Sequence, residues 1–103
     1  MTHPLVGKTY KFELGQLKVR FTFDSPSQGS FVVEEGAGLA PDGHAETVKL
    51  DLRKLREGLY LNSWTEAGGA TVTHVEDFAN ATVYSNVTVD GALYNFVGTI
   101  KEA

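Results

Sequence analysis

The stretch "GLYLNSWTEAGGATVTHVEDF", residues 58–78, decides the fold because it reads as two β-strands around a turn. Bulky side chains alternate with small or polar ones on both sides of Gly68-Gly69, with a period of two residues. A helix would instead repeat its apolar positions every three or four residues. The stretch therefore predicts an antiparallel hairpin.

The length of the hairpin loop sets which side chains share a face. A three-residue loop, with Gly69 in the left-handed conformation, places Asn62 opposite His74 and Tyr60 opposite Glu76. A two-residue loop over Gly68-Gly69 shifts the register by one and moves His74 to the other face from Glu66. The residues leave both registers open.

The same pattern extends along the chain in both directions. Turn signals rich in glycine, proline, asparagine or aspartate divide it into eight segments of alternating character. Short antiparallel strands without crossover helices avoid exposed edges by closing on themselves. We therefore predict an all-β fold, an eight-stranded antiparallel up-and-down barrel, as one domain over residues 1–103. The expected strands are 8–13, 17–24, 30–35, 44–52, 59–66, 70–78, 81–89 and 92–100. Only "LDLRKLREG", residues 50–58, could instead form a short helical turn.

Composition excludes several functions. The net charge is −4 with acids and bases interspersed, which argues against binding nucleic acid or an anionic membrane surface. The chain has no cysteine, so disulfides and thiolate metal sites are excluded. The first residues do not resemble a signal peptide, and no apolar run could span a membrane, so we expect a cytoplasmic protein.

Two further turns extend the face that carries Trp64. A loop over residues 78–80 would set His74 opposite Tyr84, and Asp90-Gly91, a strong hairpin signal, would set Asn86 opposite Asn95. The expected polar and aromatic face then gathers Tyr60, Asn62, Trp64, Glu66, His74, Glu76, Tyr84, Asn86 and Asn95. The opposite, apolar face gathers Leu59, Leu61, Val75, Val83, Val87, Tyr94, Phe96 and Ile100. By residue type alone, either face could line the interior.

A resemblance favours the polar and aromatic face as the interior. The segments "GKTYKFEL" (7–14), "LREGLYLNSWTEAGGATVTHVEDF" (55–78), "ATVYSNVT" (81–88) and "DGALYNFVGTI" (90–100) resemble the MoaF-like family, named after molybdenum cofactor biosynthesis protein F. These are lipocalin-like barrels of the calycin group. The pattern G-x-Y-x-x-S-W-T-E is also similar to the phenolic acid decarboxylases, which share the barrel.

The decarboxylase resemblance implies that Glu66, the glutamate of "SWTE", points into the barrel and acts on a substrate. The rest of that site does not match. Phe12 and Leu14 stand where the decarboxylases have two carboxylate-binding tyrosines, and "LAPDGHAE" (39–46) lacks their arginine. A carboxylate substrate would meet Glu66 without a compensating donor. The resemblance therefore implies the scaffold and a pocket rather than that reaction.

We predict that the barrel binds a small apolar or aromatic molecule, without a metal or cofactor. Glu66 and His74 are the candidate acid/base residues, and each could equally be a hydrogen-bonded structural residue. The candidate ligand-binding residues are Tyr60, Asn62, Trp64, Glu76, Tyr84, Asn86 and Asn95. Two alternatives remain. One is a cofactor-independent lyase or isomerase that uses Glu66, and the other is a structural homodimer, formed through residues 83–100, whose barrel is filled.

Overall fold

The computed structural model describes residues 3–103, and all nine regular elements in them are strands. They are β1 (Thr9–Leu14), β2 (Leu17–Ser25), β3 (Gln28–Glu35), β4 (Ala45–Lys49), β5 (Asp51–Arg56), β6 (Leu59–Thr65), β7 (Thr71–Asp77), β8 (Thr82–Val89) and β9 (Ala92–Glu102). Residues 3–103 contain no helix of the length and apolarity that a membrane crossing requires. The predicted all-β class is confirmed.

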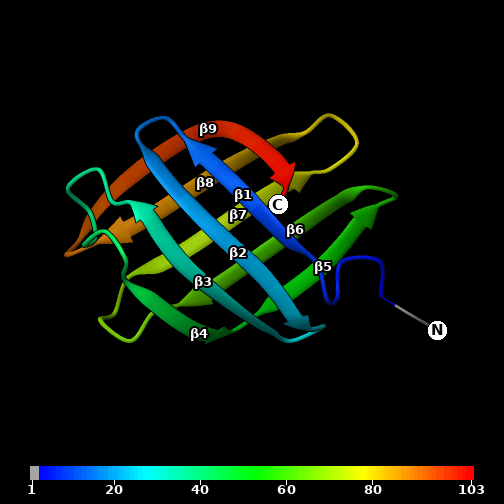
Figure 1. Ribbon diagram of the computed structural model, residues 1–103, viewed down its shortest axis with the longest axis horizontal. Coiled ribbons are helices and arrows are strands. Elements are labelled where there is room, and N and C mark those ends of the chain that lie inside the picture. Colours follow the sequence, from blue (N-terminus) through cyan, green and yellow to red (C-terminus); the bar gives the residue numbers. More distant parts are fainter. Residues whose placement is uncertain (1–2) are drawn as a thin grey trace.

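The strands form one antiparallel sheet that curls into a nearly closed barrel (Figure 1). Consecutive strands pair with each other except for β4 and β5, and β1 also pairs with β9. The hydrogen-bonded order therefore runs from β4 through β1 and β9 to β5. The two ends of this order, β4 and β5, are joined by the single buried residue Leu50. The segment formed by β4, Leu50 and β5 therefore pairs first with β3 and then, after the bend, with β6, which brings the two ends of the sheet together.

This bend explains why the structure has nine strands where the sequence predicted eight. The expected strand 44–52 is divided at Leu50, whose N–H donates to the carbonyl of Ser27 at 2.8 Å. The helical alternative for residues 50–58 is wrong, because residues 51–56 form β5 along β6. A helix this short is marginal in water, whereas pairing with β6 supplies hydrogen bonds along the segment.

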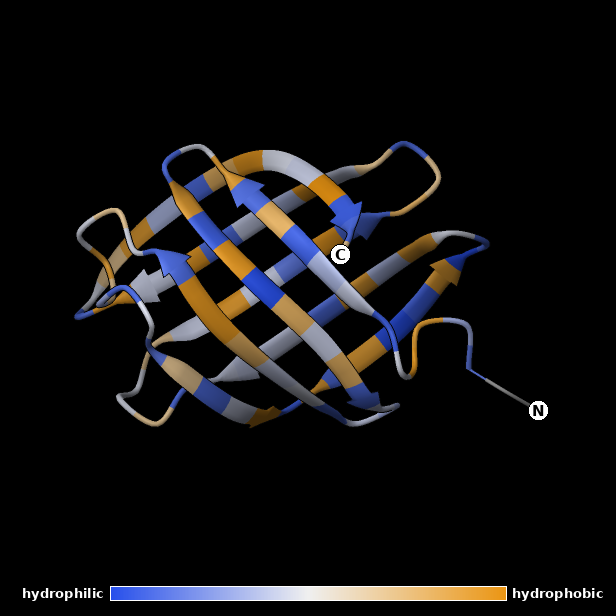
Figure 2. Ribbon diagram, viewed as in Figure 1, coloured by the Kyte–Doolittle hydropathy of each residue, from blue (hydrophilic) through white to orange (hydrophobic). Residues whose placement is uncertain are grey.

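The barrel interior combines an aromatic half with a more polar half. The alternation is visible as bands of contrasting hydropathy along β2 (Figure 2). β1 to β3 contribute the buried rings of Phe12, Phe21, Phe23 and Phe31. Across from them, β6 and β7 bury the expected face of Tyr60, Asn62, Trp64, His74 and Glu76. For these two strands the polar and aromatic face is the interior.

The hairpin of β6 and β7 has the predicted three-residue loop. The Glu66 N–H donates to the Ala70 carbonyl at 2.8 Å, and Gly69 is left-handed with φ 94°. Asn62 therefore pairs with His74. The predicted turn at Asp90-Gly91 is also confirmed, since the register of β8 and β9 sets Asn86 against Asn95.

The predicted turn between β7 and β8 is wrong by one residue. The loop spans residues 78–81, with Ala81 in the left-handed conformation at φ 54°, and His74 pairs with Ser85 rather than Tyr84. Asp77 stabilises this longer turn by accepting the Asn80 N–H at 3.1 Å.

One extra loop residue reverses the parity of β8 and, through its hairpin, of β9. Tyr84, Asn86 and Asn95 consequently lie exposed on the outer surface. Of the residues expected on the opposite face, Val83, Val87 and Ile100 are instead buried in the core, and Phe96 packs against it.

Candidate functional site

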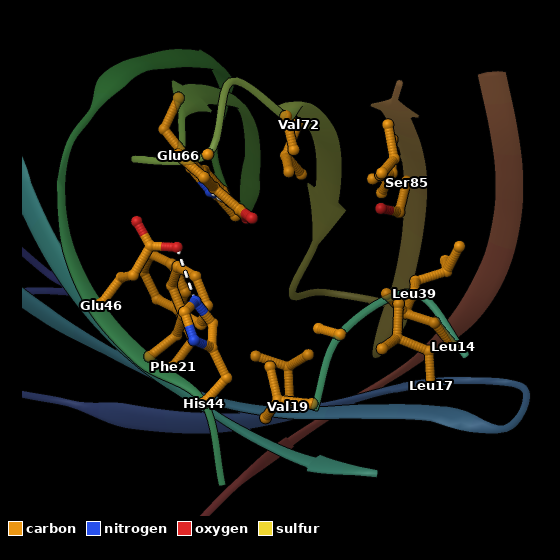
Figure 3. Close-up of a pocket in the computed structure, with 18 of the residues that line it drawn as sticks. Leu14, Leu17, Val19, Phe21, Leu39, His44, Glu46, Glu66, Val72 and Ser85 are labelled. Carbon is orange, nitrogen blue, oxygen red and sulfur yellow. Dashed lines mark hydrogen bonds and ion pairs between the residues drawn. The ribbon is translucent and has the colours of Figure 1, made fainter. Parts of the chain in front are cut away.

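A cavity of about 590 Å³ occupies one end of the barrel (Figure 3). The turns β1–β2, β3–β4, β6–β7 and β8–β9 lie at this end, and each contributes lining residues. The walls are mainly aliphatic and aromatic, and include Phe12, Leu14, Leu17, Val19, Phe21, Phe31, Val33, Leu39, Trp64, Val72 and Val87. This volume lies in the range of small-molecule sites, which are roughly 300–1,000 Å³.

Aromatic side chains fill the other end of the barrel. The ring of Phe78 lies 4.9 Å from that of Tyr10 and 5.9 Å from that of Tyr60, and Tyr10 also contacts Phe23 at 5.9 Å. Tyr60 and Tyr10 are buried there. The cavity is therefore a cup with one mouth.

A buried hydrogen-bonded group lies beneath the cavity. Nδ1 of His74 is 3.0 Å from Oε2 of Glu76, and Nδ2 of Asn62 donates to the same oxygen at 3.2 Å. Asn62 and Glu76 are fully buried and do not line the cavity, whereas the edge-on ring of His74, 4.9 Å from the Trp64 ring, does. β7 places His74 and Glu76 two residues apart on one face, and β6 adds Asn62 opposite His74.

Two carboxyl groups and a histidine stand at the mouth. Glu46 of β4 accepts hydrogen bonds from the Ala67 N–H at 2.8 Å and is 2.7 Å from Nε2 of His44. Glu66 accepts the indole N–H of Trp64 at 3.2 Å. The contact between Glu46 and Ala67 ties β4 to the β6–β7 turn, where the barrel closes.

The two carboxyl groups at the mouth have pKa values shifted in opposite directions. Burial raises the pKa of Glu66, and the nearby Glu46 raises it further, against smaller opposing effects that include the Trp64 hydrogen bond. Burial also raises the pKa of Glu46, but the hydrogen bonds from Ala67 and His44 together outweigh it, so the pKa of Glu46 is lowered. Glu46 is therefore the more acidic member of the pair.

The predicted site residues separate into three groups. Trp64, Glu66 and His74 line the cavity, while Tyr60, Asn62 and Glu76 are buried in the barrel below or beside it. Tyr84, Asn86 and Asn95 lie on the outer surface, which corrects their expected place inside, and Asn95 donates there to Asn86. In residues 3–103, no group of three or more acidic or histidine side chains is placed to hold a metal ion.

Four polar residues that line the cavity were not among the predicted site residues: His44, Glu46, Ser85 and Asp90, the last of which was predicted only as part of a turn. Ser85 was hidden by the wrong loop length before β8. His44 and Glu46 are two residues apart in "HAETVK", a period-two signal that places both on one face of a strand. Their proximity to Glu66, about 20 residues away in the chain, arises only from barrel closure.

The fold and the apolar cavity at one end of the barrel define the class of protein as an antiparallel β-barrel with an internal pocket. The model of the MoaF-like family matches residues 6–101, and the chain belongs to this family. No curated protein matches the chain. Among solved structures, the chain is similar to the "putative beta-lactamase from Burkholderia vietnamiensis", with a TM-score of 0.90. The two share 22% identity over 100% of this chain and 99% of the other, a likeness of fold.

Proposed function

We propose that this barrel binds a small, mainly apolar, uncharged molecule in its cavity. The observation that carries the proposal is the cup of about 590 Å³, with aliphatic and aromatic walls and one mouth. Moving apolar ligand surface from water into such a cavity is favourable by roughly 25 cal/mol per Å². The closed lower end supports a ligand that enters and leaves at the mouth.

The charge of the lining argues against an anionic ligand. Neither lysine nor arginine lines the cavity, and both Glu46 and Glu66 stand at its mouth. Phe12 and Leu14, which replace the decarboxylase tyrosines, are part of the apolar wall. A carboxylate would therefore lose its hydration without a cationic or hydroxyl partner from these positions.

Acid/base catalysis by Glu66 is a second candidate function. The observation that favours it is a carboxyl group that lines the cavity and has a raised pKa. A carboxyl group with a raised pKa keeps its proton to a higher pH than an ordinary glutamate, which favours a role as a general acid. The opposite pKa shift of Glu46 supplies a more acidic partner at the same mouth.

Titration with N-phenyl-1-naphthylamine, a neutral probe that brightens in apolar surroundings, tests binding. We expect saturable binding with micromolar affinity and loss of Trp64 fluorescence by energy transfer, since Trp64 is the single tryptophan. Val19→Phe, which fills the cavity wall, should weaken binding about tenfold. Val32→Phe, on the exposed face of β3, is the matched control and should leave the affinity unchanged.

Two results would contradict the binding proposal. One is the absence of saturable binding, and the other is equal weakening by Val19→Phe and Val32→Phe. Chromatography of hydroxylated aromatic compounds after incubation addresses the catalytic candidate. Recovery of every compound unchanged supports binding alone, whereas turnover that disappears in Glu66→Gln supports catalysis.

A further inference from the structure

Ser85 is a buried hydroxyl that faces the cavity without a partner. Its side chain is 1% exposed and lines the cavity, and its Oγ makes no hydrogen bond to any of residues 3–103. Figure 3 shows the oxygen directed toward the cavity, on the wall across from Glu46. Because buried polar groups are nearly always paired, this hydroxyl indicates a place where another polar group belongs.

His74 stands beside Ser85 on the neighbouring strand. The two residues are directly paired in the register of β7 and β8, so their side chains share a face with Cβ atoms roughly 5 Å apart. Both line the cavity. Together they make a polar patch in a wall that is otherwise aliphatic and aromatic.

The buried side chain of Glu76, beneath His74, decides which ring nitrogen of His74 carries the proton. Oε2 of Glu76 accepts the amide N–H of Asn62 and lies 3.0 Å from Nδ1 of His74. Because a carboxylate can only accept, we assign the proton of this second contact to Nδ1 of His74. A neutral imidazole that donates through Nδ1 carries its lone pair on Nε2. Nδ1 is the only His74 ring nitrogen with a hydrogen-bond partner within residues 3–103, and His74 lines the cavity beside Ser85, so Nε2 is the acceptor that the ring can present to a ligand.

We propose that Ser85 and His74 form a subsite for a hydroxyl group on the proposed apolar ligand, an inference that rests on the proposed function. The ligand hydroxyl donates to Nε2 of His74 and accepts from Oγ of Ser85. A carbonyl group would satisfy Ser85 alone and leave its own lone pairs against those of Nε2. A phenol or an alcohol with an apolar body satisfies both residues.

Three ligands of matched shape test this subsite by displacing N-phenyl-1-naphthylamine. 4-Ethylphenol can both donate and accept, 4-ethylanisole can only accept, and 4-ethyltoluene can do neither. We expect the wild-type protein to bind the phenol about tenfold or more tightly than the toluene, because the toluene leaves buried polar groups unpaired. The anisole should also bind several-fold more weakly than the phenol, since it cannot donate to His74.

The decisive variant is Ser85→Ala, which removes only the unpartnered hydroxyl and leaves the fold's hydrogen bonds intact. It should reduce the preference for the phenol over the toluene to about twofold or less while N-phenyl-1-naphthylamine still binds. Ser63→Ala, on the outward face of β6, is the matched control and should keep the full preference.

The outcomes separate the two proposals. If the naphthylamine probe binds but the wild-type protein does not favour the phenol, the hydroxyl subsite is wrong and cavity binding stands. A preference that persists in Ser85→Ala also overturns the subsite. If neither the probe nor any of the three ligands binds, both the subsite and the binding proposal are wrong.

Discussion

At the scale of single residues, neighbouring side chains of the same type acquire different chemistry from their hydrogen bonds. Glu46 receives two hydrogen bonds, one from a backbone N–H, whereas Glu66 receives one from an indole N–H. Both are partly buried, and burial alone penalises the charged form of each. For Glu46 the donors outweigh burial and lower the pKa, whereas for Glu66 burial and the charge of Glu46 outweigh the single indole donor and raise the pKa.

The raised pKa of Glu66 gives a prediction for stability against pH. Because folding raises this pKa above its ordinary 4.5, the folded protein holds the proton more tightly than the unfolded chain. The resulting stabilisation is present below pH 4.5 and is lost as the pH rises through the folded pKa. Glu66→Gln should therefore raise the melting temperature by about 2–4 °C at pH 8 and leave it nearly unchanged at pH 4.

Glu46→Gln is the control for that melting series, because the pKa of Glu46 is lowered by folding. Its carboxylate stabilises the fold above the unfolded pKa, and this contribution is lost as the pH falls through the folded pKa. Glu46→Gln should lower the melting temperature at pH 8 and converge with wild type at acid pH. Parallel shifts of both variants at every pH would refute the assigned roles.

At the scale of elements, the length of a turn decides the register of the strands that it joins and which of their side chains face the interior. The three-residue loop of β6 and β7 and the turn at Asp90-Gly91 contain glycines in the left-handed conformation. These glycines placed both turns from the sequence, fixed the register at Asp90-Gly91 and reduced the β6–β7 register to two choices. The turn between β7 and β8 instead uses Ala81 for this conformation. Because alanine rarely adopts positive φ, its presence in the sequence does not indicate a left-handed turn position. The predicted loop was therefore one residue too short, which reversed the predicted inward and outward faces of β8 and β9.

The contact between β1 and β9 gives a prediction at the same scale. A Cβ on Gly98 would lie 1.9 Å from the carbonyl oxygen of Glu13, so any side chain there must separate the two strands. Gly98→Ala should lower the free energy of unfolding by about 3 kcal/mol, which corresponds to more than ~10 °C in melting temperature.

Gly68→Ala is the matched control for Gly98→Ala, because an added Cβ there meets no atom within 4 Å and the backbone is not left-handed. It should change the free energy of unfolding by less than about 0.5 kcal/mol. Equal stability of Gly98→Ala and Gly68→Ala in urea unfolding would show that β1 and β9 are not held in this close approach.

At the scale of the whole molecule, the hairpin of β8 and β9 extends beyond the closed part of the barrel. β1 pairs with residues 99–102 of β9 and lies against Gly98, so residues 92–97 lack a second strand neighbour within residues 3–103 (Figure 1). The same region exposes Tyr84, Leu93 and Val97, with Val97 67% exposed. An unpaired edge beside exposed apolar side chains is typical of a pairing surface.

We propose that residues 83–100 form a homodimer through this edge, by symmetric antiparallel pairing of β9 with β9. The contacts would be made by the exposed side chains of Tyr84, Leu93 and Val97. Light scattering at micromolar concentration should give a mass about twice 11.2 kDa. Val97→Lys should convert the protein to a monomer, whereas Val32→Lys, on the exposed face of β3, should not. A monomeric wild-type protein would contradict the dimer.

The sequence by itself determined the properties that depend on near neighbours. Alternation over 58–78 and glycine turns were enough for the all-β class and for the common face of Trp64 and Glu66, because strand parity is local. The β6–β7 register, which brings His74 to that face, was one of two that the sequence left open. Only the tertiary structure decided which face is buried, where β4 bends at Leu50, and that Glu46 and Ser85 join the cavity. These depend on barrel closure and on packing between residues far apart in the chain, which period-two patterns do not encode.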